Sequence, residues 1–135
     1  MLVIENYLEE SPLHNREDGA KLLRRFHSVD KFLQYMYFIL MSEFKMAKHR
    51  CKIIDINQST IPQAICFLKG KIAAMTIVQT KCNSALSWIN SLQKPPPQLI
   101  SRSKYISNYS SKLDSIKKQY SDTILKLQNQ SDWKK

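Results

Sequence analysis

Residues 61–94 read IPQAICFLKGKIAAMTIVQTKCNSALSWINSLQK, and this stretch decides the fold class of the chain. Apolar residues recur there in alternating steps of four and three, with a single polar interruption at Gln79. Such heptad spacing is typical of helices that pack lengthwise on other helices. The apolar seam consists of Ile61, Ile65, Leu68, Ile72, Met75, Gln79, Cys82, Leu86 and Ile89. The pattern predicts one long helix.

Two further stretches repeat this spacing, and they predict long helices over about residues 21–54 and 101–130. In the first stretch, as in 61–94, apolar residues flank the seam, so the apolar face is wide enough for two neighbouring helices. The flanks of the third seam are polar, which predicts a helix that is more free to engage a partner. The first seam comprises Leu22, Phe26, Val29, Leu33, Met36 and Leu40. The third comprises Leu99, Ile106, Tyr109, Leu113, Ile116, Tyr120, Thr123 and Leu127.

The break between the first two predicted helices is DINQST, residues 55–60. Ser59 or Thr60 is suited to cap the second helix, and Pro62 falls in the first turn, where its missing N–H costs nothing. Gly70 lies inside the second helix, where glycine is unfavourable, and we interpret it as a position on a crowded face that has no room for a side chain.

A triple proline at residues 95–97 forms the second break. It denies backbone donors and disfavours the helical conformation at Lys94, so we expect the second helix to end there. The third helix then begins between Leu99 and Lys104, with Ser101 or Ser103 as its cap.

These patterns predict an all-α protein, an elongated three-long-helix bundle or coiled-coil-like assembly with a short N-terminal helix. Residues 1–20 form an acidic N-terminal segment that contains the short helix, and residues 21–135 form the helical region. At 135 residues the chain is the size of one domain.

The sequence contains little that catalysis requires. It has only two glycines, which argues against phosphate-cradling loops and nucleophile elbows. His14, His27 and His49 are not accompanied by a metal-binding spacing of cysteines or carboxylates. We therefore expect no enzymatic activity, no catalytic residues, no metal and no cofactor.

Charge is distributed unevenly along the chain, whose formal net charge is +10. Residues 1–20 carry −4, whereas Asp55 is the only acidic residue between Phe44 and Leu113. The densest basic cluster consists of Lys45, Lys48, His49, Arg50 and Lys52. Two cations would satisfy the dipole at a helix C-terminus. Five basic or titratable residues therefore also predict an acidic partner, either nucleic acid or an acidic protein tail.

Cys51, Cys66 and Cys82 are odd in number and show no CxxC spacing, which predicts free thiols in a reducing, intracellular compartment. The chain begins without the pattern of a secretory signal. The apolar run Phe32–Met41 is too short to span a bilayer, and we interpret it as a buried helix, so a membrane partner is not expected.

Gln79 is the most informative single residue of the second seam. A lone polar residue in a packing seam commonly fixes helix register or oligomeric state, because it needs a partner in one alignment. Alternatively the helix rotates slightly, so that Val78 takes the inward place.

The expected function is that of a non-enzymatic helical subunit of a larger intracellular complex, with other helical subunits as partners. Its location would be the cytoplasm, the nucleus or the cytoskeleton. The chain is similar in composition and heptad pattern to small helical subunits of eukaryotic spindle, kinetochore or trafficking complexes, which implies a scaffold or assembly role. One alternative is a small basic module that binds nucleic acid or another acidic polymer. A third is a membrane-surface protein that uses Tyr35, Tyr37 and Phe38.

Overall fold

The computed structural model describes residues 21, 23, 24 and 29–133. For residues 131–133 it describes the backbone alone. The predicted acidic segment 1–20 with its short helix, and the seam residues Leu22 and Phe26, lie outside the described residues. Within the described part every regular element is a helix, which confirms the all-α prediction.

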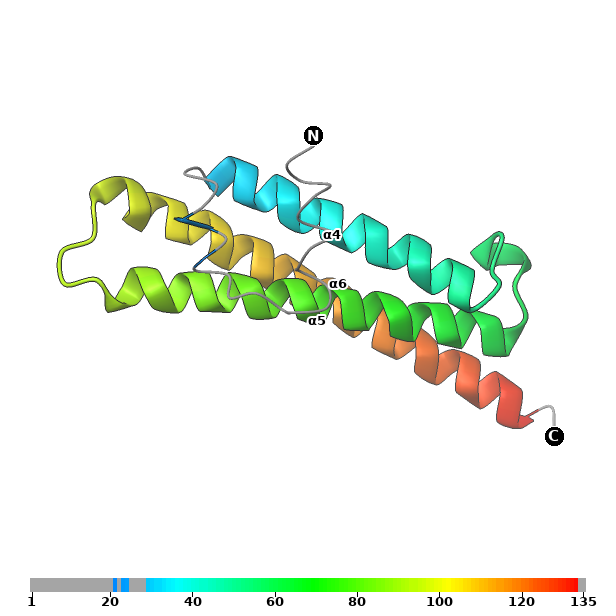
Figure 1. Ribbon diagram of the computed structural model, residues 1–135. Coiled ribbons are helices and arrows are strands. Elements are labelled where there is room, and N and C mark those ends of the chain that lie inside the picture. Colours follow the sequence, from blue (N-terminus) through cyan, green and yellow to red (C-terminus); the bar gives the residue numbers. More distant parts are fainter. Residues whose placement is uncertain (1–20, 22, 25–28, 134–135) are drawn as a thin grey trace.

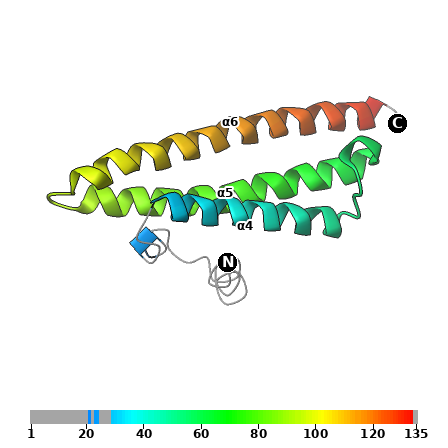
Figure 2. The same cartoon turned by 90° about the horizontal axis from the view of Figure 1, so that it is seen from above.

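Three long helices pack lengthwise in an elongated arrangement (Figures 1 and 2). Helix α4 spans Val29–Arg50, α5 spans Ile61–Ser91 and α6 spans Pro97–Trp133. A short 3-10 helix, η1 (Ile56–Gln58), lies in the connection between α4 and α5. The chain reverses direction at both connections, so α5 runs antiparallel to α4 and to α6 (Figure 1).

A capping box begins α5. Of the two predicted caps, Ser59 and Thr60, the cap is Thr60. The Thr60 hydroxyl accepts a hydrogen bond from the Gln63 backbone N–H, and the Gln63 side chain accepts one from the Thr60 N–H. Together these bonds satisfy two backbone donors that a helix start leaves without partners. Pro62 lies in the first turn, as expected.

Helix α4 ends at Arg50, four residues before the predicted end at 54. Lys52 adopts a left-handed conformation with φ of 56°, and the N–H groups of Lys52 and Ile53 bond back to the carbonyls of His49 and Lys48. This is the Schellman pattern, which closes a helix C-terminus. Ile53 then folds back and is buried beside Ala47. The lysine in a position that usually holds glycine explains why the end was not predicted.

The prolines act differently from the prediction. Helix α5 ends at Ser91, before the predicted Lys94, and α6 begins at Pro97 rather than at 101. Pro97 starts α6 because the φ angle of proline suits a first helical turn. Proline also lacks an N–H, and an N–H at this position would have no partner within the helix. The expectation of a cap at Ser101 or Ser103 is therefore wrong. Both serines lie inside α6, and the Ser103 hydroxyl bonds to the Ile100 carbonyl.

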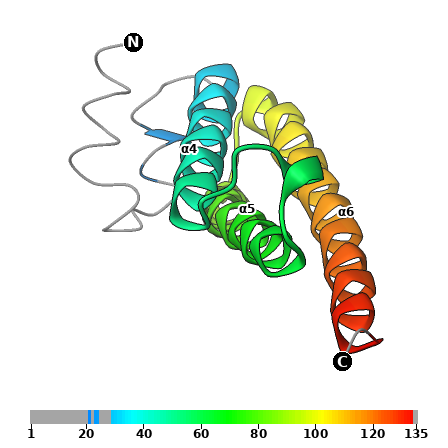
Figure 3. The same cartoon turned by 90° about the vertical axis from the view of Figure 1, so that its right-hand side faces the viewer.

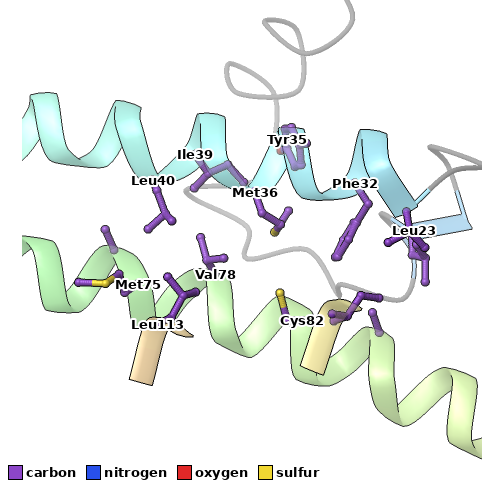
Figure 4. Close-up of a cluster of buried hydrophobic side chains, with 14 of the residues drawn as sticks. Leu23, Phe32, Tyr35, Met36, Ile39, Leu40, Met75, Val78, Cys82 and Leu113 are labelled. Carbon is purple, nitrogen blue, oxygen red and sulfur yellow. The ribbon is translucent and has the colours of Figure 1, made fainter. Parts of the chain in front are cut away.

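The main core lies where the three helices face one another (Figure 4). Its largest fully buried side chains include Phe32 and Met36 from α4, Met75 and Val78 from α5, and Ile106 from α6. A smaller cluster of Ala47, Ile53 and Phe67 lies near the α4–α5 connection. The core thus runs along much of the length that the helices share.

Helix α5 is long and apolar enough to cross a membrane, judged by length and composition alone. The central helix of a soluble protein passes the same test. Here α5 lies between α4 and α6 and packs against both.

Gly70 lies where α4 and α5 approach each other closely. A Cβ atom added at Gly70 would lie 2.6 Å from the Cβ of Ala47, and Ala47 is buried. A methyl group on a buried helix cannot move aside as the end of a flexible side chain could. The interpretation of Gly70 as a position without room for a side chain is confirmed.

We predict that Gly70→Ala lowers the free energy of unfolding by about 1–2 kcal/mol, because overpacking outweighs the roughly 1 kcal/mol gain in helix propensity. The double variant Gly70→Ala/Ala47→Gly moves the methyl group across the helix contact and should recover most of the loss. Urea unfolding of the three proteins measures both effects. A Gly70→Ala variant more stable than the parent would contradict the close contact.

A disulfide joins Cys51, directly after α4, to Cys66 in the second turn of α5, with the two Cα atoms 6.1 Å apart. The prediction of free thiols is therefore wrong for these two residues and holds for Cys82, which is buried. Spacing along the chain could not reveal the pair, because the antiparallel packing of α4 and α5 brings the two cysteines together. The bond closes the α4–α5 connection.

We predict that replacing both Cys51 and Cys66 by alanine lowers the free energy of unfolding by about 3 kcal/mol, the value expected for a loop of this length. Reduction of the parent protein should give the same loss, and the reductant should leave the double variant unchanged. Denaturant titration measures the stability. Thiol titration of the unreduced, unfolded parent should find one free thiol, and three would contradict the bond.

Candidate protein interface

Helices α4 and α6 leave one side of the molecule open. Both pack along α5, but they make few contacts with each other. At one end Arg102 of α6 forms an ion pair with Asp30 of α4, with Nη1 3.3 Å from Oδ1. Toward the other end α6 diverges from α4, as the views in Figures 2 and 3 agree. The sides of α4 and α6 that face each other are therefore only partly covered.

On α4 this open side carries Tyr37, Met41 and Phe44. Asp30 fixes the orientation, because it contacts α6, and Tyr37 follows it by two helical turns. Met41 and Phe44 then follow at the steps of four and three that keep side chains on one face. Tyr37 is 60% exposed and Met41 is 40% exposed, which is high for such large apolar side chains.

On α6 the facing side carries Tyr105, Tyr109, Ile116 and Tyr120. Arg102 orients this helix, and Tyr105 and Tyr109 follow at steps of three and four. Tyr105 is 60% exposed, and the other three are half-buried. We call the seven residues from both helices the α4/α6 face: Tyr37, Met41, Phe44, Tyr105, Tyr109, Ile116 and Tyr120.

Lys71 of α5 joins the three helices at the wide end of this face. Its Nζ lies 5.1 Å from the ring centroid of Phe44, and 5.0 Å from those of Phe67 and Tyr120. It also donates a hydrogen bond of 3.4 Å to the Tyr120 hydroxyl. A cation over aromatic rings is attracted by their negative faces. Sequence reasoning missed this role, because the rings come from three different helices.

The predicted acidic-partner cluster lies beside the same end. Lys45, His49, Arg50 and Lys52 are exposed, and Lys48 is half-buried. Within the described part of the chain none of the five forms an ion pair. Their position at the C-terminal end of α4 satisfies the helix dipole, and their exposure leaves them accessible to an acidic partner.

The side chain of Gln79, on α5, faces α6, and both the nitrogen and the oxygen of its amide form hydrogen bonds with α6. Nε2 donates to the Ser110 carbonyl at 2.9 Å and to Asp114 Oδ1 at 2.7 Å, and Oε1 accepts from Lys117 Nζ at 2.8 Å. Val78 is also fully buried, on the side that faces α4 (Figure 4). The two interpretations of this seam position are therefore compatible, since Gln79 and Val78 face different neighbours.

We predict that Gln79→Leu keeps or raises the free energy of unfolding by up to about 1 kcal/mol, because Asp114 and Lys117 regain water while leucine packs. The same change should loosen the alignment of α6 along α5. Thermal unfolding measures the first effect, and amide hydrogen exchange in α6 measures the second. Asn83→Leu on the exposed side of α5 serves as the control. A register role would be contradicted if Gln79→Leu left both the amide hydrogen exchange of α6 and the stoichiometry of the protein with its partners unchanged.

Two titratable groups in the core stay protonated at neutral pH. Burial raises the pKa of the Cys82 thiol to about 12. Burial, together with the negative charges of ionised Cys82 and Tyr37, raises the pKa of Tyr109 to about 12. A neutral buried thiol is a poor nucleophile and a poor metal ligand, so Cys82 acts as a core residue.

The other chemistry-bearing residues are dispersed. No group of three histidines, cysteines or carboxylates comes together in the described ranges. Of the aromatic residues considered for a membrane surface, Tyr35 is completely buried, Phe38 is half-buried and Tyr37 belongs to the α4/α6 face.

The predicted packing residues that the structure describes lie at least partly inside, except Thr123 of the third seam, which is exposed. The buried ones are Val29, Met36, Leu40, Leu68, Met75, Gln79, Ile89, Ile106 and Leu113. The half-buried ones are Leu33, Ile65, Ile72, Leu86, Tyr109, Ile116, Tyr120 and Leu127. Of the completely buried residues of α4, Met36 lies in the predicted seam, while Phe32, Tyr35 and Ile39 lie beside it. The helix is thus rotated slightly from the expected orientation.

Comparison of the chain with protein-family models, with curated proteins and with solved structures finds no match. A function is therefore proposed from the geometry of the described residues.

Proposed function

We propose that this protein is a non-enzymatic helical subunit of a larger assembly, and that a helix of another subunit packs on the α4/α6 face. The observation that carries the proposal is the open side between α4 and α6, with Tyr37, Met41 and Tyr105 exposed. Exposed apolar residues gathered on one side of a molecule are typical of interaction sites. Tyrosine and methionine are also enriched in protein interfaces.

A partner helix would lie lengthwise between α4 and α6 and complete a four-helix arrangement. Two helices that both pack on α5 and contact each other little offer a fourth helix a place along both of them. The heptad spacing of the helices supports coiled-coil-like packing of knobs into holes. In this proposal the partner covers Tyr37, Met41 and Tyr105, which the three helices leave exposed.

The basic cluster supports an acidic surface on the partner, next to the helix that binds. Lys45, His49, Arg50 and Lys52 are exposed at the wide end of the α4/α6 face. Complementary charge beside an apolar contact steers association and fixes orientation more than it adds affinity. Cytoskeletal, spindle or chromatin assemblies are the classes that composition and heptads favour.

We further propose a location inside the cell, with one refinement from the cysteines. Disulfides form and persist in oxidising compartments and are rare in the cytoplasm and nucleus. The Cys51–Cys66 bond therefore favours an oxidising compartment within the cell, and it weighs against the cytoskeletal, spindle and chromatin assemblies, which lie in the reducing cytoplasm and nucleus.

The second candidate function is a small basic module that binds nucleic acid or another acidic polymer. The observation in its favour is the exposed basic cluster, which has no ion-pair partner in the described part of the chain. Such binding would consist of phosphate or carboxylate contacts and would weaken steeply with salt, whereas apolar helix packing would not.

We predict that Met41→Glu lowers the affinity for the partner at least tenfold, because the charge would be buried in the contact. Met46→Glu is the matched control, since Met46 is similarly exposed on α4, at 47% compared with 40%, and lies outside the α4/α6 face. Quantitative affinity purification from the native cell compares both variants with the parent. Circular dichroism confirms that each variant is folded.

Equal recovery of the same partners with Met41→Glu and with the parent would contradict the subunit proposal. The same holds for a purified chain that is monomeric and highly stable alone and that recovers no partner. Binding that Lys48→Glu/Arg50→Glu abolishes, that Met41→Glu leaves unchanged and that falls steeply with salt would favour the second candidate.

A further inference from the structure

The connection between α4 and α5 presents apolar side chains to solvent at one end of the molecule (Figure 1). Ile54 is 92% exposed, and Ile56, the first residue of η1, is 38% exposed. Nearly the whole Ile54 side chain therefore contacts water, although burial of an isoleucine is strongly favourable. A single exposed apolar residue is ordinary, but two of them within three positions of one turn indicate a contact site.

The backbone on both sides of Ile54 is fixed, so its exposure belongs to the fold. Before it, Lys52 closes α4 in the left-handed conformation, and Ile53 folds inward and is buried. After it, the Asp55 carboxylate caps η1, since Oδ1 accepts a hydrogen bond of 3.0 Å from the Asn57 N–H. The disulfide also joins the beginning of this connection to α5. Ile54 is thus held outward before anything binds to it.

The basic cluster lies directly before these isoleucines in the chain. Its lysine and arginine residues supply four positive charges within nine positions of Ile54. Asp55 is the only carboxylate between Phe44 and Leu113, and a backbone N–H already bonds to it. Three of the cations are exposed at this end of the molecule. We call these cations and the two isoleucines the α4–α5 tip: Lys45, Arg50, Lys52, Ile54 and Ile56.

We infer that the α4–α5 tip docks on an anionic lipid membrane. The two isoleucines enter the boundary between headgroups and acyl chains, and the cations contact the negative groups of the headgroups. Apolar insertion combined with a basic cluster is how peripheral proteins bind anionic membrane surfaces. The contact lies on the surface of the bilayer and requires no membrane-spanning segment.

Other partners would use only part of the tip. Nucleic acid phosphates would pair with the cations but would leave Ile54 in water. A protein would have to enclose the projecting turn in a concave site, whereas the boundary region of a bilayer receives a small apolar projection directly. The α4/α6 face extends along the side of the molecule, so the membrane and the proposed partner helix occupy different surfaces.

Co-sedimentation of the full, unreduced chain with lipid vesicles tests the inference. The probe is a vesicle of phosphatidylcholine and phosphatidylserine in a ratio of about 7:3. We expect saturable binding to these vesicles. Vesicles of phosphatidylcholine alone should bind at least about tenfold more weakly, because they lack the negative surface potential that attracts the cations.

The apolar part of the contact is tested with Ile54→Ser. This variant should bind the anionic vesicles about tenfold more weakly, because one isoleucine no longer leaves water. Ile100→Ser is the matched control, since Ile100 is a 49% exposed isoleucine in the first turn of α6, at the opposite end of the molecule (Figure 1). The control should bind as the parent does. Circular dichroism verifies that both variants are folded.

The charged part is tested with Lys45→Gln/Arg50→Gln. A cation near an anionic surface strengthens binding about fivefold, so the loss of two should weaken it at least about tenfold. Lys94→Gln/Lys104→Gln removes two exposed cations near the α5–α6 connection and has the same net charge. This second pair should bind almost as the parent does.

Four results would overturn the inference. They are the absence of saturable binding to the anionic vesicles, equal affinity for vesicles of phosphatidylcholine alone, equal affinity of Ile54→Ser and the parent, and an equal loss in either control variant. Duplex DNA serves as the competitor. If it displaces the vesicles and binds Ile54→Ser as tightly as the parent, the basic cluster is a nucleic-acid site and the membrane inference is wrong.

Discussion

Helix α5 has apolar side chains on more than one side, and a single neighbouring helix cannot cover them all. Val78 lies on the side that faces α4 (Figure 4), while Gln79 bonds to the side chain of Asp114 and Lys71 to that of Tyr120, both on α6. Burying this surface therefore requires one helix on each side of α5. The antiparallel order of α4, α5 and α6 meets this requirement with two short connections. The open side between α4 and α6 is a consequence of the same arrangement, since both helices are held by α5.

Specific contacts then align each flanking helix along α5. On the α4 side, Gly70 allows close approach to Ala47, and one turn away the disulfide joins Cys66 to Cys51. On the α6 side, Gln79 bonds to residues 110–117 and Lys71 to Tyr120. The contacts of Gln79 and of Lys71 require the same alignment of α6. Lys71 lies eight positions before Gln79 on α5, and its partner Tyr120 lies a similar distance further along the antiparallel α6. A shift of α6 by one helical turn would break both polar contacts.

Much of the helical architecture could be predicted, because it depends on local patterns. Heptad spacing located the three helices, and Thr60 with Pro62 marked the start of α5. The ends that differ depend on single residues in unusual roles: Lys52 adopts a conformation that glycine usually takes, and Pro97 begins a helix that the triple proline was expected to precede. Width of the apolar face correctly suggested two neighbours for α5. The polar flanks of the third seam suggested a helix with one packing face that is more free to engage a partner, and α6 does pack along much of α5.

The candidate sites were less predictable, because they depend on residues far apart in the sequence. The basic cluster is contiguous and was therefore visible in the sequence. The disulfide and the three rings around Lys71 each join two or three helices. None of them has a spacing signature. They become apparent only when the alignment of both helix pairs is known.

The alignment also bears on how a partner would bind. Since α4 and α6 touch each other little, the angle between them is set by their separate contacts with α5. The disulfide holds α4 to α5 near the wide end, and Lys71 holds Phe44 and Tyr120 there as well. A face held in place before binding loses less conformational freedom when a partner arrives. Apolar residues on that face would then contribute affinity that salt does not weaken, while the neighbouring basic residues would orient the partner during encounter.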